Sequence, residues 1–228
     1  MKDDILAISN MVALSLSQFK EGINAVNMID IFVNILQYKE RFLPNHSHNV
    51  ANWCREIGME LGYSSDQLSR LIFAGVLHDA GKTMIDSSIL NSTGELTGEE
   101  YEVVKRHPID SFRIAKNLLG GLPRFMDVPE MIKYHHERYD GKGYPYGLQK
   151  DEVPFDSYII GIADAVDAML ADRPYKKAMP LKAVIRELYR NKGKQFHPKL
   201  VDIMVDRLGK AQKQLNKNLF QAMGLSSL

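Results

Sequence analysis

The sequence has few of the features that mark secreted, membrane or nucleic-acid-binding proteins. Its single cysteine, Cys54, excludes an intramolecular disulfide and fits a reducing compartment. Hydrophobic runs are all shorter than the roughly 20 residues that span a bilayer. The net charge is only +1, and acidic residues at positions 3 and 4 stand where a signal peptide would be basic. We therefore expect a cytoplasmic protein whose partners include neither a membrane nor a nucleic-acid polymer.

The length and composition predict one substantial domain with a small appendage. The chain has 228 residues, of which 45% are hydrophobic and 25% charged, as in an ordinary globular protein. Pro44-Asn45 is the best candidate boundary, because it interrupts helical periodicity. We expect a helical N-terminal segment of unknown role over residues 1–43 and a catalytic helical bundle over residues 44–228.

Helical periodicity runs through almost the whole chain and predicts an all-α fold. Gly62 and Gly81 are expected to follow helix ends, Gly81 in a left-handed conformation, and Thr97 with Glu100 forms a capping box. Only residues 138–150 are too rich in glycine and proline for a helix. The expected helices cover residues 3–19 and 24–42, a stretch from Pro44 to Gly62, one from Ser64 or Ser65 to His78, 97–107, 110–119, one starting at Pro129, 154–171, 180–190 and 198–217.

Five of the seven histidines form a spaced series with two aspartates. The steps between successive groups are 32, 28, 28 and 28 residues, about one helix with its connections. A bundle that points one group inward from each helix would gather all of them in its core. Imidazole and carboxylate ligands without thiolate favour iron, manganese or zinc. The pattern therefore predicts a polynuclear metal site formed by His46, His78, Asp79, His107, His135, His136 and Asp164.

Each member of the series also has an ordinary structural explanation. A buried Asp79 could be held by a salt bridge or a helix cap, and His107 could be a partly exposed histidine at a helix end. His135 and His136 can flank one cluster only if their helix approaches it end-on. His48 should lie on a solvated face, and His197 should be an ordinary residue at a helix start. The common spacing of the other seven groups favours the metal site.

Three specific blocks stand out in the sequence: His78-Asp79-Ala80-Gly81-Lys82, His135-His136-Glu137 and Gly143-Tyr144-Pro145. Further blocks accompany them in order: Ile89-Leu90, Gly94, Leu96-Thr97, His107-Pro108, Asp164, Asp167-Ala168 and Arg173-Pro174-Tyr175-Lys176. Together they resemble the HD-GYP domain family, the HD-superfamily branch that hydrolyses the bacterial second messenger cyclic di-GMP. The similarity extends over about residues 40–208 and implies an HD-superfamily helical bundle.

The resemblance implies a role for each matching residue. His46, His78, Asp79 and Asp164 would form the basic metal quartet, and His107, His135 and His136 would add the second metal. Asp79 would bridge the two ions, with iron or manganese favoured over zinc, and Lys82 would face the scissile phosphate as a second catalytic residue. The substrate would be held by the Gly143-Tyr144-Pro145 loop and by Arg173 and Lys176.

Three positions depart from the family pattern. Phe42 replaces a glutamate that lets some members bind a third metal, so two metals are expected here. Tyr158 stands where an arginine is frequent, and His197 follows Phe196 where an aspartate is frequent. Neither touches an expected metal position, so both changes bear on substrate detail rather than on activity.

The function implied by the resemblance is hydrolysis of cyclic di-GMP to linear pGpG, with GMP as the product of a second cut. One alternative substrate is a mixed cyclic GMP-AMP dinucleotide; an alarmone is disfavoured by the Gly143-Tyr144-Pro145 loop. Another alternative is a non-catalytic signalling module that binds diguanylate cyclase domains, but all seven ligand positions are filled. The amphipathic N-terminal helices could pair with a second subunit to form a homodimer, or pack on their own domain.

Overall fold

The computed structural model describes residues 45–119, 121–172 and 177–222, and this part of the chain is a helical bundle. It contains no strand, only an isolated bridge between Lys192 and Phe196, so the all-α prediction is confirmed. None of the helices in these ranges combines the length and the apolar character needed to cross a membrane. The predicted segment 1–43, including Phe42 and the helices proposed to dimerise, lies outside the described residues, as do Arg173 and Lys176.

Helices α3 (His46–Glu60) and α4 (Ser65–Leu77) form a tight hairpin. Gly62 adopts a φ of 76° between them, where a side chain would be strained. The Ser64 side chain accepts from the amide of Gln67, whose own side chain returns to the Ser64 amide. A Cβ on Gly75 would lie 3.0 Å from the Cα of Ala51, so the two helices pack almost backbone to backbone. This hairpin brings the start of α3 close to the end of α4.

A run of short elements follows α4: η1 (Ala80–Met84), α5 (Ser87–Leu90), α6 (Gly98–Val104), α7 (His107–Leu119), η2 (Pro123–Phe125) and α8 (Val128–Lys133). The capping box of Thr97 and Glu100 is present at the start of α6. The predicted helix boundaries near His107 were wrong, since α6 ends at Val104 and His107 begins α7 rather than ending the preceding helix. Pro108 explains the difference, because proline is tolerated in the first turn of a helix but not in its interior.

The prediction of a left-handed Gly81 was also wrong. Gly81 lies within η1 and is absent from the described glycines with positive φ. Its lack of a side chain serves close packing instead, since a Cβ there would lie 2.2 Å from the carbonyl oxygen of His107. The Gly81 amide also donates to the Ser111 hydroxyl at 2.7 Å. Glycine at this position therefore lets η1 lie directly against the first turn of α7.

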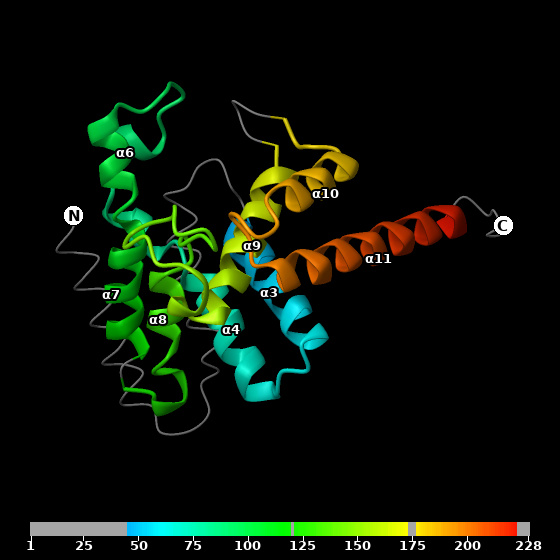
Figure 1. Cartoon of the computed structure of the whole chain (residues 1–228), viewed down its shortest axis with the longest axis horizontal. Helices are drawn as coiled ribbons and strands as arrows, with labels where there is room; N and C mark the ends of the chain where they lie inside the picture. The colour runs from blue at the N-terminus through cyan, green and yellow to red at the C-terminus, as the bar shows by residue number, and fades with distance from the viewer. Residues whose placement is uncertain (1–44, 120, 173–176, 223–228) are drawn as a thin grey trace.

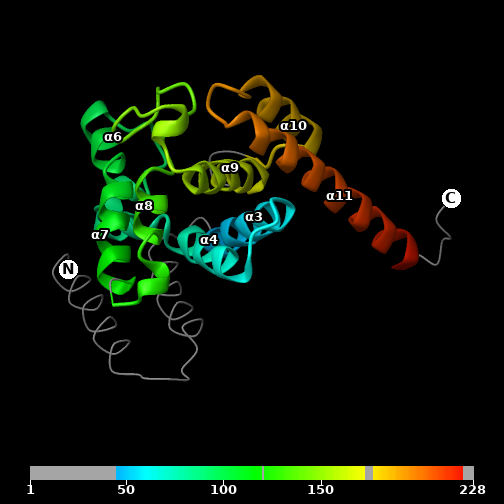
Figure 2. The same cartoon turned by 60° about the horizontal axis from the view of Figure 1, so that its bottom comes forward.

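Helix α9 (Phe155–Leu170), expected over residues 154–171, lies at the centre of the molecule (Figure 1). Figure 2 shows it lying over the α3–α4 hairpin, against which it packs. The segment predicted to be irregular precedes it and contains only the short η3 (Lys150–Glu152). The chain closes with α10 (Leu181–Arg190) and α11 (Pro198–Ala222), the latter longer than predicted and projecting from the bundle (Figure 1).

Candidate metal centre

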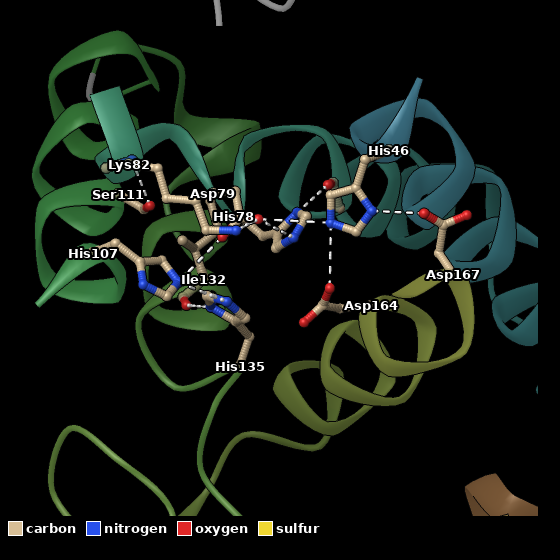
Figure 3. A network of polar contacts seen from close by, with 12 residues as sticks. His46, His78, Asp79, Lys82, His107, Ser111, Ile132, His135, Asp164 and Asp167 are labelled. Atoms are coloured by element: carbon tan, nitrogen blue, oxygen red, sulfur yellow. Dashed lines mark hydrogen bonds and ion pairs between the residues drawn. The ribbon is translucent and has the colours of Figure 1, made fainter. Parts of the chain in front are cut away.

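The bundle brings all seven predicted ligands to one place. Figure 3 shows six of them, all except His136. Most of the seven sit at helix ends. His46 and His107 are the first residues of α3 and α7, and His78-Asp79 directly follows α4. His135 and His136 lie just beyond α8, which meets the cluster end-on. Only Asp164 projects from the interior of a helix, α9.

Four histidines are held in the tautomer that a metal ligand needs. The Nδ1–H of His78 donates to the carbonyl of Gly75 at 2.7 Å, and those of His107 and His135 donate to carbonyls three residues earlier at 2.8 and 2.7 Å. His46 Nδ1 donates to the Oδ2 of Asp167 at 2.6 Å. With the proton on Nδ1, Nε2 is the ring nitrogen left to bind a metal ion once it has lost any proton of its own. The Nε2 atoms of all four histidines face the cluster.

Asp79 lies between the two halves of the site. Its Oδ2 is 3.2 Å from Nε2 of His78 and 3.6 Å from Nε2 of His46, and its Oδ1 is 3.1 Å from Nε2 of His107. Asp164 closes the first half through its Oδ1, which lies 3.2 Å from Nε2 of His46. Asp79 is accordingly the one residue common to the two ligand groups found in the described part of the chain.

The donor set fits divalent cations. The Nε2 atoms of His107 and His135 face each other at 3.4 Å although both rings carry their proton on Nδ1, so two lone pairs meet. Two nitrogens held tetrahedrally at about 2.1 Å from one ion lie about 3.4 Å apart. Nε2 of His78 and Oδ1 of Asp79 are buried and form no hydrogen bond with any described residue. A cation would satisfy these atoms.

The electrostatics of the cluster keep its acids ionised and part of its imidazoles neutral. Burial opposes the charge of Asp79, yet the neighbouring His78 and the Lys82 ammonium hold its pKa well below the ordinary value. Burial and the neighbouring histidines lower the pKa of His135 well below its ordinary value, and burial with His107 lowers that of His136 to about 3. Neutral imidazoles and ionised carboxylates are the forms that bind metal.

His46 behaves differently because three carboxylates surround it. Burial alone would lower its pKa, but hydrogen bonds with Asp164, Asp167 and Asp79 outweigh burial and raise the pKa to about 11. Without a metal ion, the first half of the site therefore attracts a proton in its place. A divalent cation would have to displace that proton on binding.

Lys82 and the Gly143-Tyr144-Pro145 loop stand beside the cluster. The Lys82 ammonium contacts Oδ2 of Asp79 from the short helix η1. The Tyr144 ring stacks on His136 with centroids 4.7 Å apart and an interplanar angle of 27°. A Cβ on Gly143 would lie 2.4 Å from the amide nitrogen of Arg138, so glycine lets the loop fold back on the histidine segment. The loop thus forms one wall of the site.

Two residues with clear roles were not assigned one from the sequence. Asp167 orients His46 through the 2.6 Å hydrogen bond, and its position three residues after Asp164 on α9 was the available signal. Glu137 is only 4% exposed, and its Oε1 accepts from the backbone amide of Tyr146 at 2.7 Å. It thereby anchors the loop that carries Tyr144. Its place directly after His135-His136 gave no hint of this role, because the partner is a backbone group.

The two departures Tyr158 and His197 are neighbours in the fold. Their ring centroids are 5.8 Å apart, and both contact Tyr139, at 5.9 and 5.1 Å. His197 lies directly before α11, and its Nδ1 accepts from the Lys199 amide at 3.2 Å, as predicted for a residue at a helix start. His48 stays outside the metal cluster as predicted, but it is partly buried rather than fully solvated. An aromatic contact therefore occupies the place where the family frequently has an arginine and an aspartate.

Comparisons with known proteins relate the chain to one domain family and to several characterised relatives. The sequence model of the HD domain family matches residues 30–200. The chain is 42% identical over 173 residues to the cyclic di-GMP phosphodiesterase response regulator RpfG of Xanthomonas campestris, covering 75% of this chain and 43% of that protein. It is 35% identical to a cyclic di-GMP phosphodiesterase of Thermotoga maritima, covering 77% and 47%. It is 33% identical to the 3'3'-cGAMP-specific phosphodiesterase 2 of Vibrio cholerae, covering 76% and 33%.

Solved structures share the fold at low sequence identity. The HDG"Y"P protein Bd1817 of Bdellovibrio bacteriovorus aligns with a TM-score of 0.61 at 16% identity, covering 91% of this chain and 71% of that one. A cyclic GMP-AMP specific phosphodiesterase of Vibrio cholerae aligns with a TM-score of 0.55 at 19% identity, covering 82% and 50%. The chain spans less than half the length of each of the three sequence relatives described above.

Proposed function

Because the chain belongs to the HD domain family, we propose that it is a metal-dependent phosphodiesterase that hydrolyses cyclic di-GMP to linear pGpG. One observation carries the proposal: imidazole Nε2 lone pairs converge around Asp79, with those of His107 and His135 only 3.4 Å apart. Relatives named as cyclic di-GMP phosphodiesterases, at 42% and 35% identity, support this choice of substrate. Since the chain matches under half of each, activity and substrate are inferences from the shared domain.

The proposed cofactor is a pair of divalent ions, with iron or manganese preferred to zinc. His46, His78, Asp79 and Asp164 would hold one ion, and Asp79 with His107, His135 and His136 would hold the other. Ions in such a site act as Lewis acids that activate water and neutralise charge on phosphoryl oxygens. The oxygen and nitrogen donors suit iron and manganese, and a thiolate ligand is excluded because the sole cysteine, Cys54, is buried in the core.

Other residues would bind the substrate and stabilise charge. Lys82 reaches Asp79 from η1, so its ammonium can shift to a phosphoryl oxygen next to the metal site and stabilise developing negative charge. Tyr144, stacked on His136, offers a ring surface beside the scissile bond. Arg173 and Lys176 are proposed to bind the dinucleotide as cations. Hydrolysis adds water to phosphorus, breaks its bond to the 3′ oxygen and opens the ring.

A second candidate substrate is a mixed cyclic GMP-AMP dinucleotide. It is favoured by the 33% identity to a 3'3'-cGAMP-specific phosphodiesterase of Vibrio cholerae, although that identity is lower than for the cyclic di-GMP enzymes. A further cut of pGpG to GMP is compatible with the same site. Binding of diguanylate cyclase domains and pairing through residues 1–43 stay predictions.

Metal analysis combined with product chromatography tests the proposed function. The anaerobically purified protein is expected to contain two equivalents of iron or manganese and to convert cyclic di-GMP to pGpG. Treatment with a chelator should abolish turnover, and Mn²⁺ should restore it. Exclusive cleavage of the mixed dinucleotide would favour the second candidate. A metal-loaded protein that cleaves neither dinucleotide would refute a phosphodiesterase.

A further inference from the structure

A cavity of about 200 Å³ adjoins the metal centre. Its lining includes His135, His136 and Asp164 of the metal centre together with Arg138, Gln195 and Phe196. Ligand pockets for drug-sized molecules measure about 300–1,000 Å³, so this cavity fits one part of a cyclic dinucleotide rather than all of it. Because it begins at residues of the metal site, a substrate whose phosphate lies at the metals could extend its neighbouring base into it.

The cavity is built on fixed backbone. The amide of Asp140 donates to the carbonyl of Lys194 at 2.8 Å, and the amide of Tyr139 donates to that of Gln195 at 3.3 Å. These bonds tie the turn between α10 and α11 to the segment that follows the metal-binding histidines. In addition, a Cβ on Gly161 would lie 2.5 Å from the His135 carbonyl oxygen, so α9 packs directly against that segment. Backbone contacts therefore hold these parts of the lining in place.

The charge of the cavity disfavours a phosphate as its occupant. Arg138 is the cation in its lining, but its Nε and Nη2 already donate to the carboxylate of Asp140 at 2.9 and 2.8 Å. Asp164 and Glu137 add acidic groups to the same lining. A second phosphate would meet carboxylates and a neutralised guanidinium, which do not attract an anion. Tyr158, Ile162 and Phe196 supply apolar surface that suits a flat, uncharged base.

Gln195 and Arg138 supply hydrogen-bond donors to the lining of the cavity. The side-chain oxygen of Gln195 accepts from Nη1 of Arg138 at 3.3 Å, so its amide group is left with N–H donors for a ligand. Arg138 has five N–H groups, and three serve Asp140 and Gln195. Guanine presents two acceptors, O6 and N7, on one edge, whereas adenine presents a donor, N6, beside N7. Donors at this position match guanine and leave the adenine amino group unpaired.

We propose that this cavity is a guanine subsite in which Gln195, oriented by Arg138, selects guanine over adenine in the base next to the cleaved phosphate. The inference rests on the proposed function, because it assigns the substrate's base at the same metal centre. A subsite on one side of the metals also fixes how a mixed dinucleotide lies. Its guanine would occupy the cavity, and one particular phosphodiester bond would then lie at the metals.

Steady-state kinetics with cyclic di-GMP, cyclic GMP-AMP and cyclic di-AMP test the proposal, using Gln195→Leu, Gln195→Glu and the exposed neighbour Lys194→Ala as control. The unsubstituted protein should prefer cyclic di-GMP to cyclic di-AMP and convert the mixed dinucleotide to one of its two linear products. Gln195→Leu should raise KM for cyclic di-GMP about tenfold with kcat unchanged, as expected for lost hydrogen bonds to a base edge. With the mixed dinucleotide, Gln195→Leu should give both of the possible linear products, because either base can then lie in the cavity. Gln195→Glu, of similar size, should favour adenine.

Equal KM values in the unsubstituted and Gln195→Leu proteins, or indifference between guanine and adenine, would overturn the guanine subsite. A changed metal content in Gln195→Leu would mean that Gln195 supports the structure of the metal site rather than binding a base, and it would also reject the proposal. If no dinucleotide is cleaved, the proposed function fails separately. Calorimetric titration of cyclic di-GMP and cyclic di-AMP into the metal-loaded protein then tests the subsite by binding alone. Tighter binding of cyclic di-GMP that Gln195→Leu abolishes supports the subsite. Equal binding of the two dinucleotides refutes it.

Discussion

Replacing Asp167 by asparagine should weaken metal binding although Asp167 is not an expected metal ligand. Its carboxylate accepts the Nδ1–H of His46 at 2.6 Å and thereby directs Nε2 of His46 towards Asp79 and Asp164 (Figure 3). A carboxylate in this position fixes the ring and raises the basicity of the ligating nitrogen. Asparagine can still accept the hydrogen bond through its oxygen, so Asp167→Asn isolates the effect of the charge from that of orientation.

The expected magnitude follows from the type of hydrogen bond. A bond to a charged group contributes about 1.5–3 kcal/mol, and a neutral one about 0.5–1.5 kcal/mol. The difference of roughly 1–1.5 kcal/mol corresponds to about a tenfold loss in affinity for the ion at His46. Asp167→Ala removes the acceptor as well, and should approach the upper end of the roughly 10–100-fold range known for such partners of metal ligands.

Competition with a chromophoric chelator for Mn²⁺ measures these affinities. Asp156→Asn is the matched control, because it removes a carboxylate from the same helix, α9, whose partner is Tyr63 rather than His46. The control should bind Mn²⁺ as the unsubstituted protein does. If Asp167→Asn also keeps full affinity, or loses no more than the control, the reasoning that Asp167 tunes the metal site through His46 is refuted.

Three further changes test other parts of the structure. Asp79→Ala should strip metal and abolish hydrolysis, because Asp79 belongs to both halves of the site. His48→Ala should retain the metal and the activity. If metal analysis and turnover give the same result for the two variants, this separation is contradicted. Glu137→Ala should raise KM at constant metal content, since the loop loses its anchor on the Tyr146 amide. Glu137→Gln should recover much of the loss. An unchanged KM in Glu137→Ala speaks against the anchor. Burial raises the pKa of Asp156, so its folded-state pKa exceeds the unfolded one and its contribution to stability falls as pH rises through that range. Asp156→Asn should therefore melt higher than the unsubstituted protein at neutral pH but not at about pH 3; a lower melting temperature at neutral pH would count against it.

The residues that gather in the candidate metal centre could be grouped from the sequence because their chemistry is visible in the residue types. Histidines and aspartates recur at helix-length intervals, so the sequence alone could group His46 with Asp164, more than 100 positions away. The helix boundaries around His107 could not be placed as well. The apolar pattern of the preceding segment continues to Val104, and only Pro108 indicates that a new helix starts at His107. Without the fold, that proline predicts a helix end as readily as a helix start.

Residues that act through others left a weaker trace in the sequence. Asp167 is one of the 28 acidic residues, and its role depends on the place of His46, which comes from another helix 121 positions away. Glu137 acts on a backbone amide, a group that every residue except proline has, so no partner could be recognised from the sequence. The contact between Tyr158 and His197 shows the same limit. Each stood out as a separate departure, and only the fold makes them one aromatic cluster.

The glycines show most clearly why the candidate metal site needs the whole fold. Gly81, Gly143 and Gly161 have negative or unremarkable φ values, so none is required by backbone conformation. Each instead lies where a Cβ would come within 2.5 Å of the backbone of a segment that carries ligands: His107, the residues after His136, and His135. Real Cβ atoms do not approach so closely, so a side chain at any of the three would push a ligand segment outward. A shift of even 1 Å would separate Nε2 atoms that now lie 3.4 Å apart. Close packing at these three points therefore sets the spacing of the histidines, and with it the fit to a cation.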